Sequence, residues 1–93
     1  VMAPAVLEFN LPANADRQRR ISACMGDVNA SAAALVAEFI RELGMPRSLA
    51  DVSVHEDQFD HIAEFTMLDF WARTNPRTVE CPADIREILE LAR

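Results

Sequence analysis

The 93-residue sequence has no lysine, no tyrosine and only two glycines. Its longest uninterrupted apolar run, residues 32–37, has six residues. A membrane-spanning helix needs about 20 such residues, so the sequence predicts no membrane span. The two glycines lie 18 positions apart and cannot form a glycine-rich phosphate-binding loop. Five prolines and two glycines are also too few for a low-complexity linker.

Cysteine is nearly absent as well. Cys24 and Cys81 lie 57 positions apart and form neither a metal-binding pair nor a disulfide framework. We expect both to be buried thiols in a reducing cytoplasm. No basic segment leads into an apolar stretch after Val1, so no signal-peptide pattern is present. The expected location is therefore the cytoplasm.

The charge is predominantly acidic. Nine arginines stand against 15 aspartates and glutamates, which gives a net charge of −6. Because binding to phosphates needs a positive face, nucleic acid is not expected as the main partner. The only basic cluster is Arg17, Arg19 and Arg20, which we interpret as a solvated helix start. An acidic surface also fits an alternative function, a stand-alone helical module that docks a protein partner.

Apolar residues recur at spacings of three and four along most of the chain, which predicts amphipathic helices. Pro12 ends the first helix, Gly26 and Gly44 end the next two, and Pro82 begins the last. The sequence predicts a single all-α domain, residues 1–93, with five helices in an orthogonal array or bundle near residues 1–10, 14–26, 30–43, 56–69 and 82–92. The expected core is Ile21, Met25, Val36, Phe39, Ile40, Leu43, Phe59, Ile62, Ile85, Ile88 and Leu89.

The first predicted helix begins inside its own apolar stripe. The stripe consists of Met2, Ala5, Val6 and Phe9. No capping residue precedes it, and Pro4 lies within it. We interpret this helix as the end of a longer one, and the chain as a fragment. A stripe without its partner predicts self-association through this helix, or contact with upstream residues of the same protein.

Residues with catalytic chemistry are sparse. His55 and His61 are six positions apart and do not share a helix face, so they predict no metal site. Asp57 and His61 have the spacing of a surface ion pair. An acidic row at intervals of four residues reads as a solvated face: Glu56, Asp60 and Glu64. We therefore predict no catalytic, cofactor-binding or metal-ligating residue in this chain.

One segment differs from an ordinary helical scaffold. Phe70 and Trp71, the only tryptophan, precede the turn at residues 74–77. Two interpretations are open. The aromatic rings fill the core while Asn75 and Pro76 make a turn, or the segment forms a binding surface. Composition alone favours the core.

Three segments occur in an order that points to a known family. They are residues 2–10 (MAPAVLEFN), residues 39–49 (FIRELGMPRSL) and residues 74–77 (TNPR). Together they resemble the C-terminal helical part of the iron-containing alcohol dehydrogenases, especially the branch that includes maleylacetate reductase. The resemblance covers essentially the whole chain.

The resemblance implies a two-domain enzyme that transfers hydride between an alcohol or carbonyl and a nicotinamide. It implies NAD(P) on an N-terminal α/β domain and Fe²⁺ or Zn²⁺ on one Asp and three His, all upstream of Val1. Residues 1–93 would then lack the nucleotide-binding domain and the metal-ligand segment, and would be inactive alone and hold no cofactor. Those upstream parts would be the partners of this chain.

The resemblance also places the loop at residues 74–77 towards the cleft between the two domains. The residues expected to line or shape that cleft are Phe70, Thr74, Asn75 and Arg77.

Overall fold

The structure, a computed structural model, describes all 93 residues and is entirely helical. Its four α-helices are α1 (Met2–Cys24), α2 (Ala32–Glu42), α3 (Phe59–Thr66) and α4 (Pro82–Leu91). Three short 3₁₀ turns are η1 (Ala50–Val52), η2 (Glu56–Gln58) and η3 (Phe70–Thr74). None of the helices combines the length and apolar character needed to cross a membrane. The all-α prediction is confirmed.

Two of the five predicted helices are joined in α1, which bends near its middle. Asn14 has non-helical dihedrals, with φ −140° and ψ 34°. Pro12 has no N–H to donate to the preceding turn, and this weakens the helix here without ending it. The buried side chain of Gln18 spans the bend. Its Nε2 donates to the Leu7 carbonyl at 2.7 Å and to Asn14 Oδ1 at 2.9 Å.

The helix ends follow the signals in the sequence. Gly26 and Gly44 adopt positive φ angles of 93° and 69°, which side chains disfavour. After α2, the Met45 N–H donates to the Ile40 carbonyl at 3.3 Å, the bond of a Schellman motif. Pro82 is at the start of α4, as predicted. The predicted helix at residues 56–69 is shorter, because η2 precedes α3 and α3 ends at Thr66.

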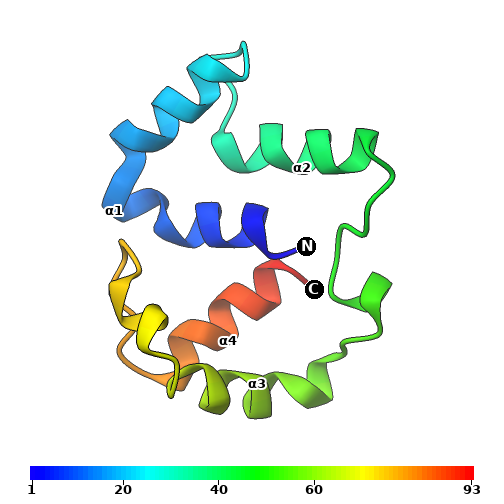
Figure 1. The fold of residues 1–93 in the computed structure, drawn as a ribbon, viewed down its shortest axis with the longest axis vertical. Coiled ribbons are helices and arrows are strands. Elements are labelled where there is room, and N and C mark those ends of the chain that lie inside the picture. Colours follow the sequence, from blue (N-terminus) through cyan, green and yellow to red (C-terminus); the bar gives the residue numbers. More distant parts are fainter.

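The helices form two packed pairs that meet along α1. The first half of α1 lies between α2 and α4, and α3 packs on α4 (Figure 1). The two termini lie close together (Figure 1). The core is formed by Ala5, Phe9, Leu49, Phe59, Ala63, Val79, Ile85, Ile88, Leu89 and Ala92. The predicted core residues Phe59, Ile85, Ile88 and Leu89 are therefore confirmed, and Ile62 packs against them.

The other half of the predicted core is not buried. Ile21 and Met25 on α1 are each 38% exposed, and Phe39 and Leu43 at the end of α2 are 52% and 57% exposed. Val36 and Ile40 are half-buried. The reason is that α2 packs only on α1, and no other helix of the chain covers its remaining apolar face.

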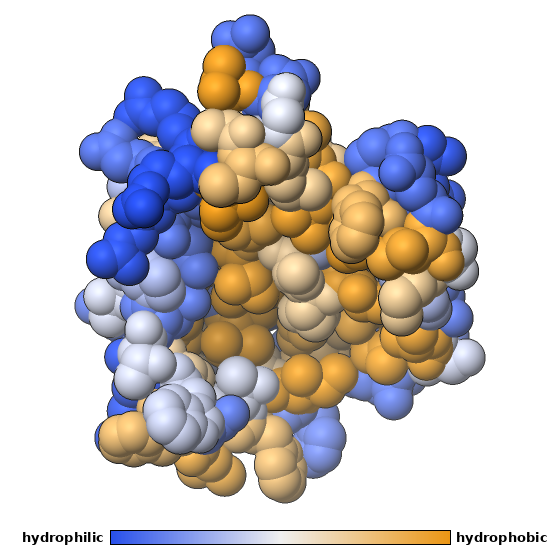
Figure 2. Space-filling view, turned by 45° about the horizontal axis from the view of Figure 1, so that its top comes forward, coloured by the Kyte–Doolittle hydropathy of each residue, from blue (hydrophilic) through white to orange (hydrophobic).

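This uncovered face enlarges the surface of the molecule. The structure exposes 6288 Å², whereas a compact monomer of 10.4 kDa exposes about 5,400 Å². Figure 2 shows apolar residues gathered in a band across one face, between hydrophilic areas. We call the exposed residues Ile21, Met25, Val28, Phe39, Leu43 and Met45 the uncovered apolar surface.

The apolar stripe of the first helix, in contrast, has a partner inside the chain. Ala5 and Phe9 are buried in the core, and Met2 and Val6 pack against it. The expectation of an unpartnered stripe is therefore wrong, because α4 covers it. Self-association stays a prediction, and this stripe no longer supports it. Val1 precedes α1 without a side-chain cap, as expected.

Both cysteines are exposed, so the prediction of buried thiols is wrong. Cys24 lies in the last turn of α1, beyond the part that packs in the core, and Cys81 is at the N-cap of α4. Both positions are at helix ends and outside the core.

Phe59 and Phe65 lie on the same helix and differ in burial, which allows a matched test. Phe59 is fully buried and Phe65 is 62% exposed. We expect Phe59→Ala to lower the free energy of unfolding by about 3–5 kcal/mol, because it leaves a cavity in the core. Phe65→Ala is expected to change it by less than about 1 kcal/mol. Urea unfolding followed by circular dichroism measures both, and equal losses would contradict this assignment of the core.

The hydrogen bonds of the Asp84 carboxylate should make the stability of the fold depend on pH. Its Oδ2 accepts hydrogen bonds from the N–H groups of Glu80 at 2.9 Å and Cys81 at 3.1 Å. These bonds hold the pKa of Asp84 below its ordinary value. A lowered pKa in the folded state stabilises the fold above about pH 4, and this stabilisation is lost as the pH falls through the folded value.

We therefore expect Asp84→Asn to lower the melting temperature at pH 7 and to approach the parent protein at about pH 3. Melting curves followed by circular dichroism at both pH values measure this. Asp57→Asn, an exposed aspartate with no such bonds, is the control. A difference between Asp84→Asn and the parent that is the same at both pH values would contradict the prediction.

Candidate functional site

A groove of about 350 Å³ lies between α1, α4 and the segment that follows α3. Its apolar floor includes Val6, Ile85 and Ile88, and one rim is formed by Trp71, Thr74 and Asn75. The groove thus combines an apolar floor with a few polar groups. It also contains two of the four residues that the sequence predicted for a cleft.

The rim is built by residues 69–77, which we call the aromatic segment. The Asp69 carboxylate caps its start by accepting from the Trp71 N–H at 3.0 Å. The Thr74 hydroxyl donates to the Trp71 carbonyl at 2.8 Å. These local bonds close η3 on itself.

The two aromatic rings of this segment point away from the core. Phe70 is 67% exposed and Trp71 is 73% exposed. Their rings pack edge to face, with centroids 5.7 Å apart. The interpretation that they fill the core is therefore wrong. The reason is that α3 ends at Thr66 and η3 turns the chain outwards.

The far end of the aromatic segment is bonded to α1. The side-chain amides of Asn10 and Asn75 face each other. Asn10 Nδ2 donates to Asn75 Oδ1 at 3.0 Å, and Asn75 Nδ2 donates to Asn10 Oδ1 at 2.6 Å. The backbone N–H of Arg77 adds a third bond to Asn10 Oδ1, at 3.3 Å.

The Arg77 side chain connects α1 to α4 beside the Asn10–Asn75 pair. Its guanidinium carbon lies 3.9 Å from the centre of the Phe9 ring, a cation–π contact. Nη1 donates to the Phe9 carbonyl at 3.2 Å and to Glu87 Oε1 at 3.1 Å. We call Asn10, Asn75, Arg77 and Glu87 the Asn10 cluster.

The four predicted cleft residues thus have different surroundings. Thr74 and Asn75 line the groove. Phe70 does not line it and packs on the edge of Trp71, which does. The Arg77 side chain lies behind the rim, engaged with Phe9 and Glu87.

Sequence analysis missed Asn10 and Glu87. Asn10 is in a segment that carries the family resemblance, but no local pattern indicates a bond to a residue 65 positions away. Glu87 looks like any charged residue on the exposed face of a helix.

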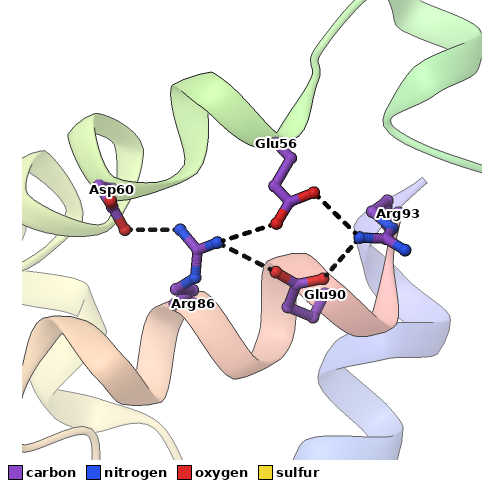
Figure 3. A network of polar contacts seen from close by, with 5 residues as sticks. All are labelled: Glu56, Asp60, Arg86, Glu90 and Arg93. Atoms are coloured by element: carbon purple, nitrogen blue, oxygen red, sulfur yellow. Dashed lines mark hydrogen bonds and ion pairs between the residues drawn. The ribbon is translucent and has the colours of Figure 1, made fainter.

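The acidic row was interpreted wrongly in part. Glu56 and Asp60 are not merely solvated, because both bind arginines from the C-terminal part of the chain (Figure 3). Arg86 contacts Asp60 at 2.6 Å and Glu56 at 3.3 Å. Arg93 contacts Glu56 at 3.2 Å, and Glu90 completes the network. The network ties η2 and α3 to α4 and uses these carboxylates structurally.

The histidines do not form a site. The His61 ring packs against Phe65, with centroids 4.8 Å apart, and the predicted ion pair with Asp57 is not formed. No group of three or more His, Cys, Asp or Glu side chains has the arrangement of a metal site. The residues present therefore do not fit a bound Fe²⁺ or Zn²⁺ ion.

The chain is similar to a family of known enzymes. Residues 1–92 match the C-terminal part of the Fe-containing alcohol dehydrogenase family. The 4-hydroxybutyrate dehydrogenase of Cupriavidus necator is 35% identical over 95 residues, which cover 97% of this chain and 25% of the relative. The 1,3-propanediol dehydrogenase of Klebsiella pneumoniae is 31% identical over 86 residues, which cover 83% of this chain and 22% of the relative.

A second 1,3-propanediol dehydrogenase, from Citrobacter freundii, is 30% identical over 102 residues, which cover the whole of this chain and 25% of the relative. The chain thus spans about a quarter of the length of these curated relatives. No solved structure matches the chain. The likeness to the maleylacetate reductase branch stays a prediction.

We expect the 93-residue chain by itself to bind neither Fe²⁺ nor Zn²⁺ at the affinity of a structural site, because such a site needs three or four convergent ligands. Isothermal titration calorimetry with each metal measures this. Double substitution of His55 and His61 by Ala is the control and should leave the weak background unchanged. Stoichiometric binding that this double variant abolishes would contradict the prediction.

Proposed function

The chain belongs to the Fe-containing alcohol dehydrogenase family, and on this basis we propose that it is the C-terminal helical domain of a longer NAD(P)-linked, metal-dependent dehydrogenase. The observation that carries the proposal is the match over residues 1–92 to the C-terminal part of that family. Relatives about four times as long support it. The reaction would be reversible hydride transfer between an alcohol or carbonyl and a nicotinamide.

The metal and the nicotinamide would be held outside this chain. Residues 1–93 offer no metal-ligand cluster and no glycine-rich phosphate loop. In the longer protein those groups would belong to the remaining three quarters of the chain. The role of this domain would then be to shape the substrate cleft and to cover the rest of the enzyme.

The uncovered apolar surface supports a covering role. Val28, Phe39, Leu43 and Met45 are each more than half exposed, and patches of this kind are usually buried against another surface. We assign this surface to contact with the remaining part of the same enzyme. The alternative, a stand-alone module that binds another protein, has the same surface but does not account for the length of the relatives.

We assign the groove and its aromatic rim to the cleft. Thr74 and Trp71 would contact substrate and Phe70 would support Trp71. Asn75 would fix the rim that it helps to line, and Arg77 would shape that rim from behind. The named activities of the relatives suggest small primary alcohols such as 1,3-propanediol and 4-hydroxybutyrate as trial substrates.

The test uses the complete gene product. Its mass should exceed that of the 93-residue chain several-fold, and it should reduce NAD⁺ or NADP⁺ in the presence of 1,3-propanediol or 4-hydroxybutyrate. Trp71→Ala should raise KM by roughly 10-fold, which corresponds to a loss of about 1.4 kcal/mol of contact with substrate. The absorbance of the NADH or NADPH that is formed measures the rate of the reaction.

Phe65→Ala is the matched control, because Phe65 is a similarly exposed aromatic residue outside the aromatic segment. It should leave KM unchanged. A gene product of only 93 residues would favour the stand-alone module. Equal effects of Trp71→Ala and Phe65→Ala would refute the assignment of the groove to the cleft.

A further inference from the structure

Asn10 is a buried amide whose partners all come from one distant segment. It is 5% exposed and lies on α1 directly after the buried Phe9. A buried amide without partners costs about 1–3 kcal/mol. Its side-chain bonds go to Asn75 and to the backbone N–H of Arg77, 65 and 67 positions away. The position of residues 75–77 is therefore coupled to α1.

The Asn10–Asn75 pair is specific in its chemistry. Each amide donates one N–H and accepts one N–H, so both oxygens and both nitrogens are used. Asn75 Nδ2 also donates to the Arg77 carbonyl at 2.6 Å, which closes the turn around Pro76. Only another short amide pair reproduces this arrangement, because a carboxylate accepts but does not donate.

The aromatic segment is consequently held at both ends. Its start is bonded to the end of α3, since the Asp69 N–H donates to the Thr66 carbonyl at 3.0 Å. Its end is bonded to α1 by Asn10 and stacked on Phe9 by Arg77. Between these anchors Phe70 and Trp71 make no bond to the core and are mostly exposed. Two fixed ends are what keep exposed rings in one place beside the groove.

We infer that Asn10, together with Asn75 and Arg77, positions the Phe70–Trp71 pair on the rim of the groove and so sets the affinity for substrate. Asn10 is a positioning residue, since its side chain does not line the groove. The inference rests on the proposed function for its effect on substrate. The fixing of the aromatic segment is testable without it.

The test compares two buried amides of α1 in the complete gene product. Asn10→Ala removes the bond to the aromatic segment. Gln18→Ala removes an equally buried amide, 3% exposed, which spans the bend of α1 and does not touch that segment. Hydrogen–deuterium exchange with mass spectrometry reads peptides covering residues 69–77. We expect about tenfold faster exchange there in Asn10→Ala and no change in Gln18→Ala.

Kinetics supply the second readout. Asn10→Ala should raise KM for the alcohol by about 3- to 10-fold with a smaller effect on kcat. Asn10→Asp keeps the oxygen that accepts from Asn75 and Arg77 but places a second acceptor against Asn75 Oδ1, so it should restore neither the exchange protection nor KM. Asn75→Ala removes the same amide pair from the side of the aromatic segment, without a change in α1. It should have the same effects as Asn10→Ala and serves as the test where Asn10→Ala does not fold.

The outcomes are distinguishable. Equal acceleration at residues 69–77 in Asn10→Ala and Gln18→Ala would overturn the inference, because it would show a general loss of stability. Selective acceleration with unchanged KM would also overturn it, while leaving the proposed dehydrogenase activity intact. A complete gene product without dehydrogenase activity would overturn the proposed function, and with it the effect on substrate. Hydrogen–deuterium exchange at residues 69–77 would then show only whether Asn10 fixes the aromatic segment.

Discussion

The contact between Asn10 and Asn75 is the interaction on which the rest of the site depends. The two residues are 65 positions apart in sequence, and Arg77 adds its own contacts with Phe9 and Asn10 beside them. The Asn10 amide is buried and Asn75 is half-buried, and a buried amide needs partners for its hydrogen-bonding groups. That requirement fixes the register of the turn at Pro76 against α1, and Arg77 extends it to Glu87 on α4. Three separate pieces of chain are thereby held in one arrangement around the groove.

The packing of the molecule is unequal on the two sides of α1. Towards α3 and α4, Phe9 and Phe59 are sealed in a core with Ile85, Ile88 and Leu89. Towards α2, the two helices pack on each other, but the outer apolar face with Phe39 and Leu43 stays open. The well-packed side carries the groove and the aromatic segment. The open side is the surface that we propose to contact the remaining part of the enzyme. Helix α1 therefore lies between the proposed substrate groove and the proposed domain contact.

Local signals predicted most of the fold, because they act within a few residues. Gly26, Gly44 and Pro82 mark helix ends through backbone geometry alone, and all three are where the sequence indicates. The sequence predicts that Pro12 ends the helix, yet the helix passes through it and bends at Asn14, where the Gln18 side chain bridges the two halves. The periodicity identified apolar faces correctly. It could not say which faces the chain covers, since that depends on how many helices are available to cover them.

The site was predictable only where its residues share a short segment. The turn at residues 74–77 is recognisable from its composition, but its partners on α1 and α4 carry no local signal. This explains why the same residues read as a cleft from the resemblance and as a structural contact from the geometry. The two descriptions agree because Thr74 and Asn75 line the groove, while Arg77 lies behind its rim. The side chains of Asn75 and Arg77 form hydrogen bonds with α1 and α4. The Phe70 and Trp71 side chains of the same segment are exposed. A domain that offers no metal-ligand cluster and no phosphate loop would then contribute to catalysis through the shape and apolar character of the surface it presents.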